Sequence, residues 1–290
     1  MLQAKNLDDQ IKEFWPKNGP PAQEVKKYIK KYLKEKIVIK CGGRVLLDPI
    51  LFENFIEDIA ILKKLGLSPF VVHGGGPRIK KKLIELNIET KFIMGLRVTD
   101  DKVIKVVEEV MIKFNKEIVD ALEKKNCKSK SITVKENNII YVRQKNFELG
   151  FVGTPTKIDT KLINNLINEN YIPVITPMGL DDQNKIYNIN ADTAAGALAV
   201  SLKSRRLLLM TDVEGVYDKN KKLISELRPT EAEKLKENDT IKEGMIPKIK
   251  TCINSIEDGV RGVVIIDGRK PHSILFELFS DKGAGTLIRK

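Results

Sequence analysis

Hydrophobic and polar positions along the chain follow one arrangement that occurs twice. A short, continuous apolar run, typical of a strand buried on both faces, leads to a glycine turn and then to a helical pattern. The first copy spans 37–66, where an Ile-Val-Ile run and a Gly-Gly pair precede a helix opened by Asp48 and Pro49. The second copy passes through the His-Gly-Gly-Gly of 73–76 and opens its helix at Pro77. Strand, glycine loop and helix, twice in succession, predict an α/β fold with a parallel sheet.

The same reading predicts the other elements and a division of the chain. Further helices are expected over 24–36, 99–125, 159–170, 191–203 and 273–279, and around Glu231 and Ile249. Further strands are expected over 131–135, 138–143, 172–176, 207–210, 263–266 and 286–288, with Gly150 and Gly153 in a turn. We expect an N-terminal arm with a helix over 1–36, a first lobe over 37–203 and a second lobe over 204–290.

Composition narrows the class of protein. With 290 residues, 42% of them hydrophobic, and only 19 Gly and 12 Pro, disordered and collagen-like chains are excluded. The net charge is +12, but the 51 basic residues are mostly lysine and are dispersed, so a solvated surface is favoured over a nucleic-acid site.

Cysteine usage and hydropathy bear on the compartment. Cys41, Cys127 and Cys252 are widely spaced without a metal-ligand spacing, so we expect neither a disulfide nor a bound structural metal. No run approaches the roughly 18 apolar residues of a membrane span, and no targeting peptide is expected. We therefore expect a cytoplasmic protein, or one of the plastid stroma if it is organelle-encoded, with no membrane and no nucleic-acid partner.

The glycine loops are the first candidate site. Loops at the carboxyl ends of neighbouring parallel strands lie where such sheets bind ligands, and consecutive glycine amides can form a cradle for phosphate oxygens. The patterns GxxxxGK[ST] and GxGxxG do not occur, so tight structural turns are the alternative. Lys40, at the end of an apolar strand, favours a site because its ammonium would stabilise a transferred phosphoryl group. The alternative for Lys40 is a strand-end lysine whose charged head reaches water.

Seven segments, taken together, resemble the amino-acid kinase family, and within it the members that phosphorylate N-acetyl-L-glutamate. They are IVIKCGG (37–43), VVHGGGP (71–77), GLRVTD (95–100), NINADTAA (188–195), LLLMTDVEGVYD (207–218), GMIPK (244–248) and GAGTLI (283–288). The resemblance covers 37–290. It implies a three-layer α/β/α sandwich with a mainly parallel central sheet and two lobes, the acetylglutamate-binding lobe first and the ATP-binding lobe second.

The implied reaction transfers the γ-phosphoryl group of ATP to the side-chain carboxylate of N-acetyl-L-glutamate, in arginine biosynthesis. Two anions must meet, so the site needs positive charge and fixed amides more than a base. By the resemblance, Lys40 and Lys248 stabilise the transferred group, and Asp192 holds both ammonium groups. His73 is expected to be a packed loop histidine rather than a base. Mg²⁺ is expected to be held mainly by the ATP phosphates, with no metal ligands from the protein.

The resemblance also assigns binding and regulatory residues. The expected substrate-binding residues are Gly74, Gly75, Gly76, Arg97, Asn188 and Asn190, with Arg97 on the substrate α-carboxylate because a guanidinium binds it in a bidentate fork. The expected ATP-binding residues are Gly42, Gly43, Thr211, Asp212, Val213, Gly244 and Met245. The residues expected to bind arginine, as in arginine-inhibited members of the family, are Tyr28, Tyr32, His272, Glu277 and Gly283. For the tyrosines, core contacts of an amphipathic helix are the alternative.

Partners and competing functions complete the expectations. The resemblance implies a homohexamer built as a trimer of dimers, and members from photosynthetic lineages also bind a signalling protein of the PII type. The alternatives are another carboxylate kinase of the same fold, aspartokinase-like, or a non-catalytic arginine sensor. Two residues depart from the family pattern: Cys41 replaces an aromatic residue or leucine, and Arg44 replaces a small residue in the first glycine loop.

Overall fold

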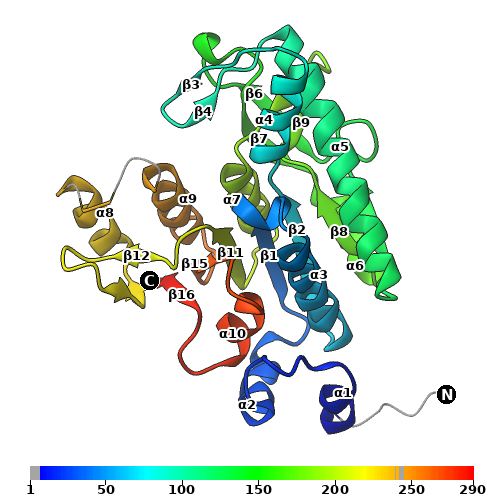
Figure 1. Cartoon of the computed structure of the whole chain (residues 1–290), viewed down its shortest axis with the longest axis vertical. Coiled ribbons are helices and arrows are strands. Elements are labelled where there is room, and N and C mark those ends of the chain that lie inside the picture. Colours follow the sequence, from blue (N-terminus) through cyan, green and yellow to red (C-terminus); the bar gives the residue numbers. More distant parts are fainter. Residues whose placement is uncertain (1–6, 239, 242–244) are drawn as a thin grey trace.

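The computed structural model describes residues 7–238, 240–241 and 245–290, and an eight-stranded sheet runs through the middle of the molecule (Figure 1). Every adjacent pair of its strands is parallel except β15 with β16. In spatial order its strands are β14 (Glu226–Leu227), β16 (Gly285–Ile288), β15 (Val263–Asp267), β11 (Arg206–Thr211), β1 (Lys36–Cys41), β2 (Ser68–His73), β8 (Ile172–Ile175) and β5 (Ser129–Ile132). The predicted α/β fold with a mainly parallel sheet is confirmed.

Helices cover both faces of this sheet. They are α1 (Leu7–Phe14), α2 (Ala22–Tyr32), α3 (Pro49–Lys64), α4 (Gly76–Glu85), α5 (Asp101–Lys124), α6 (Thr160–Asn168), α7 (Ala191–Ser201), α8 (Pro229–Glu237), α9 (Ile246–Glu257) and α10 (Ser273–Phe279). Successive residues of β1 show the arrangement: Ile37 and Ile39 pack with α3, α5 and α10, whereas Val38 packs with α6, α7 and α9. Both faces are therefore buried, which gives the three layers and explains the continuous apolar runs of the strands.

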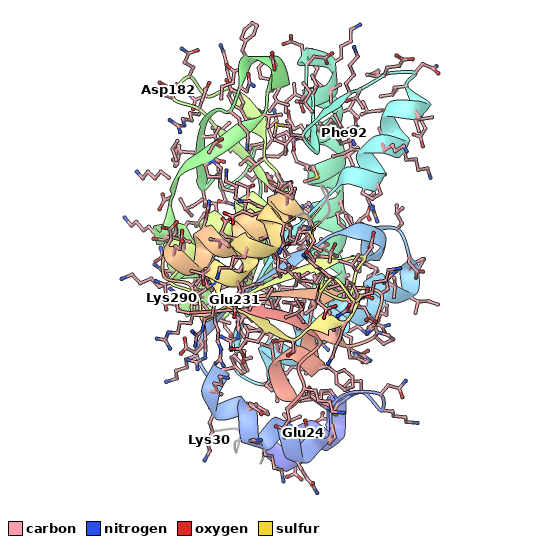
Figure 2. All side chains as sticks on the ribbon, turned by 90° about the vertical axis from the view of Figure 1, so that its left-hand side faces the viewer. Glu24, Lys30, Phe92, Asp182, Glu231 and Lys290 are labelled. Carbon is pink, nitrogen blue, oxygen red and sulfur yellow. The ribbon has the colours of Figure 1, made fainter. Side chains whose placement is uncertain are left out.

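Three smaller sheets complete the structure. A four-stranded sheet contains, in spatial order, β10 (Ile186–Asn188), β9 (Met178–Leu180), β6 (Ile140–Gln144) and β7 (Gly153–Ile158). Two hairpins pair β3 (Phe92–Ile93) with β4 (Leu96–Arg97), and β12 (Val216–Tyr217) with β13 (Leu223–Ile224). Figure 2 shows Phe92 of β3 far from Glu24 and Lys30, which lie on α2 at the opposite end of the molecule.

Three predicted elements differ from the structure. The strand expected over 131–135 lies at Ser129–Ile132, as β5. The helix expected over 24–36 ends at Tyr32, because the chain turns through Lys34 at φ 60° and is already in β1 at Lys36. Gly150 does occupy a turn, at φ 66°, but Gly153 begins β7 and so is not a turn residue. The division into an arm and two lobes stays a prediction.

Candidate active site

Lys40 lies inside the central sheet, between β2 and β11. Its Cα pairs in register with Val72 of β2 and with Leu209 of β11, and only 8% of the residue is exposed. Its Nζ donates to the carbonyl oxygen of Met210 at 3.4 Å. An ammonium group this buried requires a negative partner, since desolvation strongly disfavours an unpaired charge.

Asp192, in the first turn of α7, is that partner for two lysines at once. Its Oδ1 lies 2.9 Å from Lys40 Nζ, and its Oδ2 accepts a hydrogen bond from Lys248 Nζ at 2.6 Å. Lys248 is buried in the first turn of α9, where the helix dipole opposes a positive charge, so the pairing with Asp192 compensates both costs. The three side chains that the sequence analysis grouped therefore lie in direct contact.

Close packing of α7 on α9 brings these charges together. Gly196 of α7 faces α9: a Cβ added there would lie 2.9 Å from Thr251 Cγ2 and 3.0 Å from Ser255 Oγ. The small-residue helix predicted over 191–203 thus allows a short interhelical distance. Asn190 begins α7, with its Oδ1 accepting from the Thr193 backbone amide at 3.1 Å.

The charge balance of this cluster is positive. Burial favours the neutral form of Asp192, but the charges of Lys40 and Lys248 outweigh it and hold the pKa of Asp192 well below its usual range. Burial and then the neighbouring Lys40 lower the pKa of Lys248 from its ordinary value. One carboxylate between two ammonium groups leaves net positive charge, which can stabilise negative charge that moves between two bound anions.

The two glycine loops lie beside Lys40 and contact each other. The Gly74 amide donates to the Cys41 carbonyl at 2.7 Å, so the second loop is fixed to the first and this amide is not available to a ligand. A side chain at Gly42 would collide with Lys40 Nζ. Gly43 has φ 65°, and a side chain there would collide with the Asp212 carboxylate. Gly43 is therefore required by its backbone conformation, and a side chain at Gly42 would displace the Lys40 ammonium.

A cavity of about 240 Å³ opens next to Lys40 and the glycine loops. All the predicted substrate-binding residues line it, together with Gly42 and Gly43: Gly74, Gly75, Gly76, Arg97, Asn188 and Asn190. Several apolar residues that were not predicted from the sequence also line it: Leu46, Phe92, Met111 and Val152. A groove of about 400 Å³ between β7, α7 and α9 is larger, but none of the predicted site residues line it.

Arg97, at the end of β4, provides an anion-binding group in this cavity. Only 8% of the residue is exposed, and its guanidinium lies 4.7 Å from the centre of the Phe92 ring. Nη2 donates to the Gly76 carbonyl at 3.4 Å, while Nη1 is buried and has no hydrogen-bond partner among the described residues. Burial lowers the pKa of Arg97. A buried guanidinium nitrogen without an acceptor is costly and would be satisfied by a bound carboxylate.

Of the predicted nucleotide-binding residues, Gly42 and Gly43 line this cavity, whereas Thr211, Asp212, Val213 and Met245 are not among its lining residues. Thr211 ends β11, Asp212 follows beside Gly43, and Val213 is 36% exposed. Met245 precedes α9, and Gly244 lies outside the described residues. In the part of the chain that the structure describes, no three His, Cys, Asp or Glu side chains group as metal ligands.

Arg78 is a positioning residue of this site that the sequence analysis missed. From α4, its Nε donates at 2.8 Å to the carbonyl of Leu46, in the short helix Gly43–Leu46 that continues the first glycine loop. Its Nη1 pairs with Glu117 at 2.6 Å, and its guanidinium lies 3.9 Å from the centre of the Phe114 ring. Arg78 thus links the first loop to α5. No sequence signal distinguished it from the neighbouring lysines of α4.

The predicted arginine-binding residues are only partly brought together. A cavity of about 280 Å³ between α2 and α10 is lined by Tyr28, Tyr32, Glu277 and Gly283, with Arg206 as a lining residue that was not predicted. Burial raises the pKa of Glu277, whose Oε2 accepts from the Ala284 amide at 2.9 Å.

His272 is the exception in this set. It is not among the residues that line the cavity, because its Nδ1 lies 2.7 Å from Oδ1 of the buried Asp58 on α3. Its direct contact with the effector cavity, expected from the resemblance, is therefore not found. The pairing instead joins the start of α10 to α3.

The fold and the paired buried lysines define the class of protein. Residues 35–267 match the amino acid kinase family, and the chain belongs to this family. Within it, the chain is 56% identical over 283 residues to an acetylglutamate kinase of Pelagibacter ubique, covering 98% of each chain. It is 46% identical over 297 residues to an acetylglutamate kinase of Petrotoga mobilis, covering 100% of this chain and 97% of that one.

Solved structures share the fold. N-acetylglutamate synthase from Neisseria gonorrhoeae, complexed with coenzyme A and N-acetyl-glutamate, superposes with a TM-score of 0.84 at 24% identity. The match covers 92% of this chain but 62% of the synthase chain. Carbamate kinase from Giardia lamblia, bound to AMP-PNP, gives a TM-score of 0.66 at 16% identity, covering 89% and 99% of the two chains. Among the described residues, no helix is long and apolar enough to span a membrane.

Proposed function

We propose that this protein is an ATP-dependent kinase that phosphorylates the side-chain carboxylate of N-acetyl-L-glutamate, in arginine biosynthesis. The observation that carries the proposal is the buried Lys40–Asp192–Lys248 cluster beside a cavity that also holds an unsatisfied guanidinium nitrogen of Arg97. Relatives named acetylglutamate kinase match nearly the full chain, which supports the choice of substrate.

In this proposal the site binds and orients two anions. Arg97 binds the α-carboxylate of the substrate, Asn188 and Asn190 contribute to its binding, and the side-chain carboxylate lies near the glycine loops. A carboxylate oxygen attacks the γ-phosphorus of ATP, and the bond from that phosphorus to the β-phosphate oxygen breaks, giving N-acetyl-L-glutamyl 5-phosphate and ADP. The acceptor is ionised at neutral pH, so no base is needed. Lys40 and Lys248 stabilise the charge of the transferred group.

ATP is proposed to bind beside the first glycine loop. Its proposed contacts are Gly42, Gly43, Thr211, Asp212, Val213, Gly244 and Met245. Mg²⁺ would be held mainly by the ATP phosphates and water, because it prefers oxygen ligands and keeps several waters. When bound, it would neutralise part of the phosphate charge.

A substrate panel tests the proposal. The purified protein is given Mg-ATP with N-acetyl-L-glutamate, L-aspartate or L-glutamate, and hydroxylamine is added to trap an acyl phosphate as a hydroxamate. We expect ADP and hydroxamate to form in equal amounts with acetylglutamate, and neither product to form with aspartate or glutamate. Turnover of aspartate instead would establish the aspartokinase-like alternative. Arginine binding without turnover of any of the three would establish a non-catalytic sensor.

We further propose that arginine inhibits the enzyme by binding between α2 and α10. Within the described part of the chain, no Lys or Arg nitrogen lies at ion-pair distance from the half-buried Glu277 carboxylate, which fits a ligand that brings its own guanidinium. Inhibition requires arginine to bind one conformation of the enzyme better than another. Tyr28, Tyr32 and Gly283 line the same cavity.

Glu277→Gln tests the arginine site. We expect it to raise the arginine concentration for half-inhibition by about tenfold or more, since a charge-assisted pair is lost. Glu226→Gln is the matched control, because Glu226 lines the same cavity but is already paired with Arg289, at 2.7 Å and 3.0 Å. Equal effects of the two substitutions, or an unaffected Glu277→Gln, would place arginine elsewhere.

Assembly and location stay predictions. In the proposal, α2 contributes to a homohexamer; within this chain it packs on α10, with the Tyr32 and Phe279 rings 6.2 Å apart. Light scattering of the full chain measures the oligomeric state, and a pull-down with a PII-type signalling protein tests that partner. Cytoplasmic or plastid location is tested by fractionation.

A further inference from the structure

His73 ends β2 directly before the second glycine loop, and it is fully buried. Its ring packs edge-on against Phe114 of α5, with the ring centres 5.1 Å apart. Nδ1 lies 3.0 Å from the carbonyl oxygen of Gly74, and Nε2 lies 3.2 Å from Nδ2 of Asn115 on α5. Both ring nitrogens therefore have a partner inside the protein, and neither reaches the cavity.

Asn115 determines which ring nitrogen carries the proton. Its Nδ2 also donates to the backbone carbonyl of Val174 at 2.9 Å, and a carbonyl can only accept, so the orientation of the amide is fixed. The group that faces His73 Nε2 is consequently a donor, and Nε2 must accept. A neutral imidazole has a single N–H, which leaves the proton on Nδ1, where it donates to Gly74. Burial lowers the pKa of His73 to about 4, so the ring is neutral at physiological pH.

The Nδ1–H donor fixes the peptide plane between Gly74 and Gly75. In a trans peptide the carbonyl and the following N–H point in opposite directions, so a Gly74 carbonyl held against the ring turns the Gly75 N–H away from it. Gly75 lines the cavity next to Lys40, and no backbone carbonyl of the described residues accepts from its N–H. Glycine has the widest backbone freedom, so this direction requires an outside contact to fix it.

We propose that His73 is a positioning residue: with its tautomer set by Asn115, it holds the Gly74–Gly75 peptide so that the Gly75 N–H faces the phosphoryl group in transfer. This inference rests on the proposed kinase function. It gives a role to the buried pair of His73 and Asn115, neither of which takes part in the proposed phosphoryl transfer. His73 takes no proton from the substrate and does not touch it.

Two substitutions separate the two ring nitrogens. His73→Asn places an amide donor near the position of Nδ1 and keeps the bond to Gly74, whereas His73→Gln places its amide near Nε2 and removes that bond. We expect kcat of His73→Gln to fall by about 10- to 100-fold, because the Gly75 N–H is misdirected but not removed. The KM values for ATP and acetylglutamate should change by less than about threefold. His73→Asn should recover most of that loss. Equal kcat values for the two variants would overturn the proposal.

A spectroscopic measurement on the wild-type protein does not depend on any variant folding. The chain has only two histidines, so ¹⁵N-imidazole NMR of histidine-labelled protein gives two ring patterns, and the His73→Asn spectrum assigns them. We expect His73 to be the Nδ1–H tautomer between pH 6 and 8, and the Nε2 resonance to move in Asn115→Leu, where the hydrogen bond that Nε2 accepts is lost. A wild-type Nε2–H tautomer would overturn the inference. The expected tautomer in a protein that does not phosphorylate acetylglutamate would instead count against the proposed function alone.

Discussion

The lysine–aspartate cluster and the cavity between α2 and α10 are both charged and both partly buried, yet they differ in how their charges are satisfied. In the cluster, Asp192 is within 2.9 Å of two ammonium groups, so the protein supplies all the counter-charge that it needs. In the cavity, the half-buried Glu277 accepts one backbone hydrogen bond but has no ion-pair partner within the described residues. A closed cluster suits chemistry that must be ready before substrates arrive, whereas an incomplete pair suits reversible binding of an effector.

Lys248→Ala is the substitution with the largest expected effect, because it removes one of two charges proposed to face the transferred group. We expect kcat to fall by about 10²- to 10³-fold, with the KM for ATP largely kept. Steady-state kinetics with acetylglutamate measure the change. Lys250→Ala, on the exposed side of the same helix, is the control and should keep wild-type kcat. Unchanged kcat in Lys248→Ala would remove this lysine from the mechanism.

Arg97→Lys should have an intermediate effect confined to one substrate. A lysine keeps the positive charge but cannot form the bidentate fork with a carboxylate, which costs about 1.5–3 kcal/mol. We expect the KM for acetylglutamate to rise by about 10- to 100-fold while the KM for ATP stays within about twofold. Arg143→Lys, on exposed β6, is the matched control. Equal increases for both substrates would indicate a general distortion of the cavity.

His272→Asn should have the smallest effect, and on stability rather than turnover. The hydrogen bond to Asp58 raises the pKa of His272 above its ordinary 6.5, while burial raises the pKa of Asp58 to about 6. Both shifts mean that the folded pair binds protons more tightly than the unfolded chain. The contribution of His272 is therefore present below pH 6.5 and is lost as pH rises through its raised pKa, whereas that of Asp58 is lost earlier, as pH rises from 3.8 through about 6.

Urea unfolding of wild type and His272→Asn at several pH values between 5.5 and 9 measures this difference. We expect the two free energies of unfolding to converge as pH rises. His73 is present in both proteins, so its own contribution, which changes between pH 4 and 6.5, cancels in the comparison. Parallel curves would mean that the charge of His272 adds nothing to stability. A contact between His272 and arginine would then be tested by arginine titration of the same variant.

Local signals in the sequence predicted the parts of the fold that local chemistry determines. Asp48 caps α3 by accepting from the amides of Ile50 and Leu51, as the Asp-Pro pair indicated. Strands β9 and β10 were missed, since each has only three residues and their pairing depends on partners elsewhere in the chain.

The sequence analysis grouped residues that lie together in the structure, but it could not predict the contacts between them. Asp192 and Lys248 are 56 positions apart, and only the packing of α7 on α9 brings them within hydrogen-bond distance. Arg97 was singled out by its motif, but no pattern showed that Nη1 would be left without an acceptor. The resemblance placed His272 in the cavity between α2 and α10, but in this chain its ring pairs with the buried Asp58 of α3 instead.

The hydrogen bond from the Gly74 amide to the Cys41 carbonyl has a mechanical consequence. It joins the two glycine loops, so neither loop can move independently without breaking this hydrogen bond. The same bond extends the pairing of β1 with β2. Entry of substrate and escape of product then depend on the walls of the cavity. The β3–β4 hairpin, whose Phe92 is 58% exposed at the far end of the molecule from α2, forms one of these walls.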